Sequence, residues 1–121
     1  MTDLFIDDVR TPPEGWDWAK TYDEAISMVG NGYEAISLDH DLSEQHYMAF
    51  IENSDYELGT GYDILKFMAM NNIWPDILAI HSGNPVGRKN MFDLIESTRL
   101  YDRPIMGSIG QWTGVTIFRK K

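Results

Sequence analysis

The sequence predicts an α/β domain with a mostly parallel sheet, and three observations lead to this fold class. Short apolar runs at residues 4–6, 35–38 and 77–80 stop abruptly at polar or charged residues, as buried strands do. Segments in which apolar residues recur at helical spacing alternate with these runs. Alternating strands and helices are typical of parallel strands joined by right-handed crossovers. We therefore expect a mostly parallel sheet with helices on both faces.

Capping signals place three helices between and after these strands. Thr21, followed by Glu24 three residues later, forms a capping box ahead of an apolar helical pattern that a Gly-Asn-Gly sequence ends near residue 30. Thr60 can cap a second helix, which closes near residues 71–72. Asn84, followed by a proline, is typical of the start of a third helix.

Three further segments are less regular. Residues 16–19 alternate large and small side chains like a brief strand, and glycines at 107, 110 and 114 favour short strands or a hairpin in the tail. Residues 43–58 are polar without a clear period, and a loop of this length usually has a function. We interpret them as a lid or rim.

Length and composition limit the possible functions. A chain of 121 residues is long enough for one hydrophobic core, so we expect a single domain over residues 1–121. A net charge of −9 disfavours duplex DNA and anionic membranes as partners. The chain has no cysteine, no secretory signal and no apolar run long enough to span a bilayer, so we expect a cytoplasmic protein.

Polar clusters follow three of the predicted strands. The carboxyl ends of parallel strands share one edge of the sheet, where ligands of such folds bind. This edge is therefore the expected site, and the clusters that reach it are Asp7-Asp8, Asp39-His40-Asp41 and His81-Ser82-Gly83-Asn84.

The acidic residues Asp7, Asp8 and Asp39 are candidate metal ligands. Several carboxylates in one pocket repel one another and raise their pKa values unless a cation lies between them. A small number of carboxylate oxygens beside a substrate phosphate is a ligand set that suits Mg²⁺, so we expect Mg²⁺ as an optional cofactor. The alternative is that Asp7 or Asp8 pairs with Arg10 or accepts backbone N–H groups in the turn.

The two histidines at the strand ends, His40 and His81, are candidate acid–base catalysts. Hydrolysis of a phosphodiester needs one proton removed from water and another delivered to the leaving oxygen, and imidazole can do both near neutrality. Asp39 or Asp41 would orient one of the rings. The alternative is that each histidine is a hydrogen-bonded structural residue.

The start of the third predicted helix is a candidate anion site. Unpaired N–H groups and the helix dipole favour a phosphate there, contacted by Ser82, Asn84 and the amide of Gly87. Arg88 could close on the phosphate bidentately, and Arg10 is a second candidate cation. The alternatives are an ordinary N-cap at Asn84 and an ordinary surface charge at Arg88.

Four motifs are similar to the cyclic-phosphate processing, receiver-like family. They are Phe-Ile-Asp-Asp-Val-Arg from Phe5, Ser-Leu-Asp-His-Asp-Leu from Ser37, Thr-Gly-Tyr-Asp from Thr60 and His-Ser-Gly-Asn-Pro-Val-Gly-Arg from His81. The resemblance covers residues from about 4 to 91 and implies a receiver-like (flavodoxin-like) sheet and an activity on cyclic phosphates. The chain departs from receivers in a shortened first crossover and in the absence of a terminal helix.

Our leading hypothesis is a phosphoesterase for a cyclic phosphate, either a 2′,3′-cyclic phosphate RNA end or a cyclic nucleotide. Its partner would then be a small nucleotide or an RNA end. One alternative is a receiver-like signalling module in which Asp39 accepts a phosphoryl group. Another is a protein that binds a cyclic nucleotide without catalysis.

Overall fold

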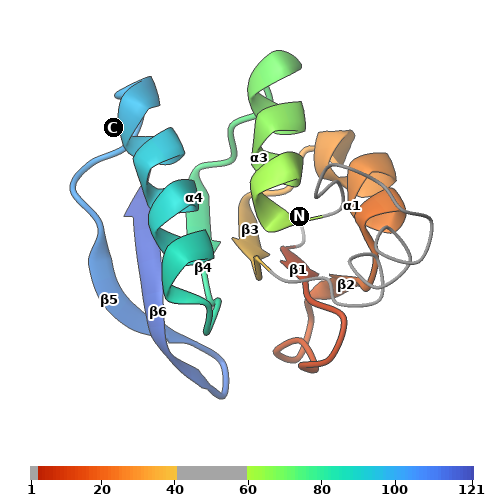
Figure 1. The fold of residues 1–121 in the computed structure, drawn as a ribbon. Helices are drawn as coiled ribbons and strands as arrows, with labels where there is room; N and C mark the ends of the chain where they lie inside the picture. Colours follow the sequence, from red (N-terminus) through yellow and green to blue (C-terminus); the bar gives the residue numbers. More distant parts are fainter. Residues whose placement is uncertain (1–2, 41–59) are drawn as a thin grey trace.

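The computed structural model describes residues 3–40 and 60–121, which form a six-stranded sheet in the order β2-β1-β3-β4-β6-β5 (Figure 1). Four strands are parallel: β1 (Leu4–Ile6), β2 (Asp17–Ala19), β3 (Ala35–Leu38) and β4 (Ile77–Ile80). Strand β6 (Trp112–Arg119) runs antiparallel to β4, and β5 (Ile105–Ile109) runs antiparallel to β6. The predicted α/β class and mostly parallel sheet are confirmed. The segment interpreted as a lid, residues 43–58, lies outside the described residues.

The helices begin at the predicted caps. The Thr21 hydroxyl accepts the backbone N–H of Glu24 ahead of α1 (Tyr22–Met28), which continues into a short 3₁₀ turn, η1 (Val29–Asn31). Thr60 and Asp63 form a reciprocal capping box at α3 (Gly61–Met70). The side chain of Asn84 accepts the Gly87 N–H ahead of α4 (Pro85–Thr98). Among the described residues, no helix is long and apolar enough to cross a membrane.

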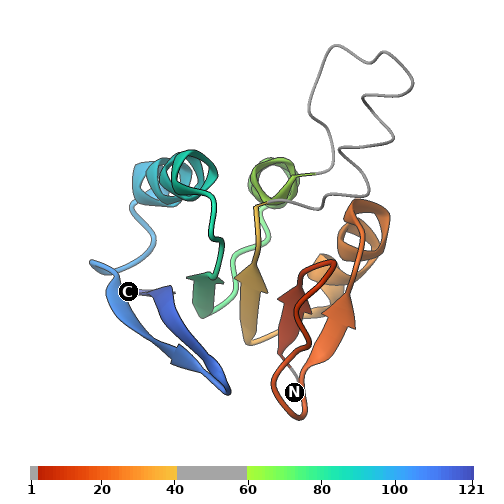
Figure 2. The ribbon, with the colours of Figure 1, turned by 60° about the horizontal axis from the view of Figure 1, so that its bottom comes forward.

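All the described helices pack on one face of the sheet, which corrects the prediction that helices cover both faces. Figure 2 shows α1, α3 and α4 on the same side of the strands. They share a single apolar core with the strand residues that point to that side, Leu4, Ile6, Ile36, Leu38, Leu78, Ile80 and Phe118. Because β2-to-β3 and β3-to-β4 both advance in one direction along the sheet, right-handed crossovers place both connections on the same face.

The connection from β1 to β2 advances in the opposite direction and has no helix. Its shortness, expected from the sequence, is confirmed by the parallel pairing of these strands across only residues 7–16. Trp16 packs edge-on against Phe5, with 6.3 Å between ring centroids. Phe5 points to the face opposite the helices, because side chains alternate along a strand and its neighbours Leu4 and Ile6 lie in the helix-covered core.

The β5–β6 hairpin turns at the same edge of the sheet where the parallel strands end (Figure 1). Its turn is fastened to the β1–β2 connection. Trp112 Nε1 donates to the backbone oxygen of Thr11 at 2.7 Å. Gly110 has a φ of +52°, and a Cβ there would lie 2.6 Å from Pro13 Cβ, so this close approach requires glycine. The hairpin therefore forms one wall of the predicted site.

Candidate functional site

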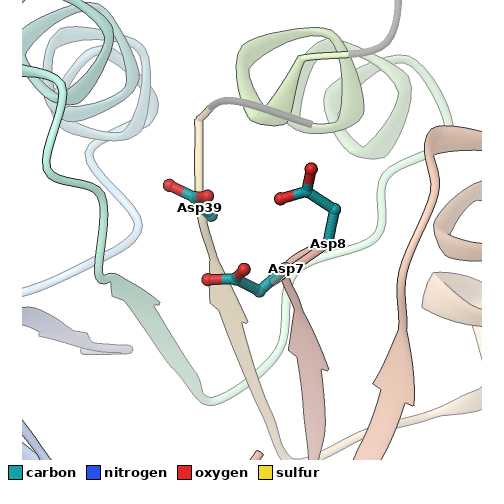
Figure 3. A group of neighbouring side chains, drawn as sticks. All are labelled: Asp7, Asp8 and Asp39. Carbon is teal, nitrogen blue, oxygen red and sulfur yellow. The ribbon is translucent and has the colours of Figure 1, made fainter. Parts of the chain in front are cut away.

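The polar residues after β1, β3 and β4 lie together at one edge, as expected. Backbone hydrogen bonds continue the parallel ladder by one residue past each strand, from Asp7 N to Ala19 O, from Asp39 N to Ile6 O and from His81 N to Leu38 O. Figure 3 shows Asp7, Asp8 and Asp39 gathered at the ends of β1 and β3. The regular ladder therefore fixes where these side chains begin.

Asp7 is the centre of a buried hydrogen-bond network. Its Oδ1 accepts the backbone N–H groups of Val9 and Arg10, both at 2.8 Å. Its Oδ2 accepts Arg10 Nη1 and His81 Nε2, both at 3.0 Å. Burial raises the pKa of this carboxyl, but the hydrogen bonds from His81, Val9 and Arg10 outweigh it and lower the pKa to about 2. The alternative interpretation of Asp7, pairing with Arg10 and the turn, is what the structure shows.

His81 is held on all sides by its neighbours. Its ring stacks on Phe5 with 4.3 Å between centroids, and Ser37 Oγ lies 2.6 Å from Nδ1. Burial lowers the His81 pKa, partly opposed by the hydrogen bond and charge of Asp7. An ionised Asp7 only accepts, so Nε2 carries the proton and Nδ1 accepts from the Ser37 hydroxyl. Both ring nitrogens of His81 are therefore engaged with protein partners.

The structure does not bring His40 and His81 together as the predicted acid–base pair. His81 points to the face that carries Phe5 and Ser37. His40 follows Asp39 on the chain, and its ring lies against α4, where a Cβ added at Gly87 would overlap the imidazole. Because neighbouring side chains alternate across a strand, the two imidazoles project from opposite faces. This geometry disfavours the expected division of acid and base roles between them, which stays a prediction.

The start of α4 is closed by an N-cap hydrogen bond at the place where a bound anion was predicted. Gly87 N donates to Asn84 Oδ1 at 3.0 Å, so the cap uses the amide that was predicted to contact a phosphate. Asn84 N in turn donates to Ser82 Oγ at 3.0 Å. The ordinary N-cap interpretation of Asn84 is the one observed, and a substrate contact by Asn84 or Gly87 stays a prediction.

A pocket of about 500 Å³ opens beside these residues, between the strand ends and the hairpin. The lining residues are Arg10, His81, Ser82, Gly83, Arg88, Gln111, Trp112, Thr113 and Gly114. Arg88 Nη1 donates to the Ser82 carbonyl at 3.3 Å, which holds its guanidinium at the rim. Arg10 Nη1 lies 3.7 Å from Asp39 Oδ2 as well as contacting Asp7. The pocket thus joins four predicted residues, Arg10, His81, Ser82 and Arg88, and places two guanidinium groups at one hollow.

The structure adds two participants to the predicted site, Ser37 and Trp112. Ser37 is a lone hydroxyl in an apolar run two residues before Asp39, a spacing that places both on one face of the strand. Trp112 lies in the tail, where no motif marks it. Asp41, a predicted catalytic residue, lies outside the described residues.

The acidic cluster fits a magnesium ion only in part. Asp7, Asp8 and Asp39 each offer an oxygen, and these atoms lie within 4.8 Å of one another. However, both oxygens of Asp7 already accept two hydrogen bonds each, and Arg10 contacts Asp7 and Asp39 at once. The guanidinium thus supplies positive charge between these two carboxylates. Asp7 therefore has little capacity left to act as an oxygen ligand of Mg²⁺.

A comparison with known proteins identifies the family of the chain. Residues 2–97 match the family model described as the cyclic-phosphate processing receiver domain. No curated protein and no solved structure matches the chain. The matched residues include the strand ends, both pocket arginines and nearly all of α4. The chain therefore belongs to the cyclic-phosphate processing receiver domain family.

Proposed function

We propose that the domain binds a cyclic phosphate in the pocket between Arg10 and Arg88 and hydrolyses it. The supporting observation is this pair of guanidinium groups at one hollow of a protein whose net charge is −9. Each guanidinium has five N–H donors, more than its contacts with Asp7, Asp39 or the Ser82 carbonyl use, and such donors favour an anionic ligand. Arginine also presents a planar fork of donors that matches phosphate oxygens.

The two arginines would contribute to the reaction through charge. Attack of water on the phosphorus of a cyclic diester increases the negative charge on the phosphoryl oxygens. Donors that are already oriented stabilise that charge without a reorganisation cost. Arg10 is oriented by Asp7 at 3.0 Å, and Arg88 is oriented by the Ser82 carbonyl at 3.3 Å. Both are therefore preorganised for a phosphate.

The proton transfers are assigned to groups other than the predicted pair of histidines. His81 holds Asp7, and through it Arg10, so we assign it a positioning role. Asp39 is linked to the pocket by its 3.7 Å contact with Arg10, and we assign its carboxylate the removal of a proton from the attacking water. The ring-opened oxygen would take its proton from solvent. Mg²⁺ held by Asp8 and Asp39, when bound, would add positive charge beside the phosphate.

The test compares two neighbouring cations of α4. Wild type, Arg88→Gln and Lys89→Gln are incubated with nucleoside 2′,3′-cyclic and 3′,5′-cyclic phosphates, with and without EDTA, and products are followed by ³¹P NMR. Lys89 is the matched control, because it pairs with Asp93 at 2.8 Å on the exposed side of the helix. We expect turnover by wild type, a loss of tenfold or more in Arg88→Gln and no change in Lys89→Gln. Absence of turnover by wild type under all conditions would refute hydrolysis.

A second candidate function is phosphoacceptor signalling through Asp39. The observation in its favour is the position of Asp39 beside Asp7 and Asp8. Intact-mass analysis after incubation with acetyl phosphate and Mg²⁺ tests it. One added phosphoryl group that Asp39→Asn abolishes would favour signalling over hydrolysis. The third possibility, binding without catalysis, predicts tight calorimetric binding with full recovery of the cyclic ligand.

A further inference from the structure

Four of the nine residues that line the pocket come from a part of the chain that the family match does not include. The match ends at residue 97, whereas Gln111, Trp112, Thr113 and Gly114 belong to the β5–β6 hairpin. Residues within the match thus supply both arginines of the pocket, and the hairpin tip supplies the remaining lining residues.

The hairpin tip is fixed in position instead of hanging over the pocket. Trp112 Nε1 and Gln111 Nε2 both donate to the Thr11 carbonyl, at 2.7 and 3.3 Å. Gly110 packs closely on Pro13. These contacts attach the tip to the same short connection that carries Arg10. A ligand held by Arg10 therefore meets a preformed wall, which costs little ordering on binding.

The indole of Trp112 is the large apolar surface of that wall. The side chain is half-buried, and its N–H is already used by Thr11, so the ring has a fixed plane. Arg10 Cζ lies over the indole ring, 5.9 Å from its centroid, so a phosphate-binding group is already in contact with this aromatic surface. A pocket of about 500 Å³ is in the size range that holds drug-sized ligands, well beyond a bare phosphate.

We propose that Trp112 is a stacking platform for the base of a nucleoside cyclic phosphate, and that the hairpin tip thereby sets substrate specificity. The inference rests on the proposed function, because it requires the phosphate to be held by Arg10 and Arg88. Aromatic side chains stack on any base through its π face. The selected feature is then the presence of a base, not its hydrogen-bonding pattern.

Calorimetry with two ligands tests the proposal. One ligand is adenosine 2′,3′-cyclic phosphate, and the other is methyl riboside 2′,3′-cyclic phosphate, which has the same ring but no base. Wild type should bind the adenosine ligand on the order of tenfold more tightly than the base-free one. Trp112→Leu should weaken binding of the adenosine ligand far more than binding of the base-free ligand, and so remove this difference. Trp112→Phe should retain most of it.

The control is Trp74→Leu, a half-buried tryptophan that packs on Tyr101 and lines none of this pocket. It should bind both ligands as wild type does. Equal affinity of wild type for the two ligands would overturn the proposal. So would an equal loss for both ligands in Trp112→Leu, since that would show a role only in supporting Arg10. Failure of the proposed function is a different result: Arg88→Gln would then bind the base-free ligand as tightly as wild type.

Discussion

His81 Nε2 donates to Asp7 Oδ2 at 3.0 Å and so joins the end of β4 to the end of β1. The bond is one link of a chain that begins at Ser37 in β3 and ends at the guanidinium of Arg10 in the pocket. Three neighbouring strands thereby determine where one phosphate-binding group lies. The histidine acts through Asp7 and Arg10 and has no ring nitrogen directed to a substrate.

The first prediction concerns the link between Ser37 and His81. Neutral His81 should carry its proton on Nε2, which long-range ¹H–¹⁵N NMR can identify. Ser37→Ala should lower the free energy of unfolding by about 1–2 kcal/mol, because a buried imidazole nitrogen loses its donor. Ser97→Ala, at an exposed position of α4, is the control for serine removal and should cost less. A proton found on Nδ1 would contradict the assignment.

The second prediction concerns acid stability. The pKa of Asp7 is about 2 in the folded protein and near 3.8 when unperturbed. A lowered pKa means that the unfolded chain binds the proton first as pH falls. The carboxylate therefore contributes about 2 kcal/mol of stability above pH 4, and this is lost as pH falls toward 2. Urea titrations across this range should show the loss in wild type.

Asp7→Asn should abolish that acid-dependent loss while lowering stability at neutral pH. The matched control is Asp93→Asn, which removes a half-exposed carboxylate paired with Lys89 and should keep the wild-type pH profile. Burial also lowers the His81 pKa, so this residue removes stability as pH falls below its ordinary value of 6.5. An Asp7→Asn profile parallel to that of wild type between pH 4 and 2 would contradict the network.

The position of the site could be predicted because it follows from chain direction alone. Parallel strands end at one edge, so Asp7, Asp39 and His81 had to lie near one another. Their partnerships depend on the face to which each side chain points. Side chains alternate between the two faces of a sheet, so Asp39 and His40 point to opposite faces. The same alternation places Ser37 of β3 beside His81 at the end of the neighbouring strand β4. When a strand is apolar on both faces, its sequence does not show which side chains point toward the helices and which point away from them.

The hairpin side of the pocket depends on contacts between distant segments. Trp112 reaches Thr11 across a sequence separation of 101 residues, and no local pattern in the tail indicates this pairing. The side of the sheet covered by helices likewise follows from strand order, which places β2 outside β1. The sequence shows that the connection between β1 and β2 is short. That one face of the sheet is left without a helix follows only from the strand order.

The third prediction concerns the contact of His40 with α4. Gly87→Ala should destabilise the fold by about 1–3 kcal/mol, because the added methyl group overlaps the His40 ring. Gly30→Ala is the control, since its nearest non-neighbouring atom would be Ile73 Cδ1 at 3.8 Å. Removing the ring in Gly87→Ala/His40→Ala should recover part of the loss. Strict additivity of the two substitutions in urea unfolding would show that the residues do not touch.

The fourth prediction separates the charge of Arg10 from its shape. Arg10→Lys keeps the positive charge but replaces a planar fork of five donors by one ammonium group. The ammonium has three donors on one nitrogen, so if that nitrogen stays with buried Asp7 its donors reach less of the pocket than the spread nitrogens of a guanidinium. Calorimetry should therefore show affinity for a cyclic nucleotide reduced on the order of tenfold, a loss of about 1.4 kcal/mol. Arg103→Lys, at an exposed position away from the pocket, should bind as wild type does. Wild-type affinity in Arg10→Lys would mean that Arg10 serves Asp7 alone and that Arg88 holds the phosphate without it.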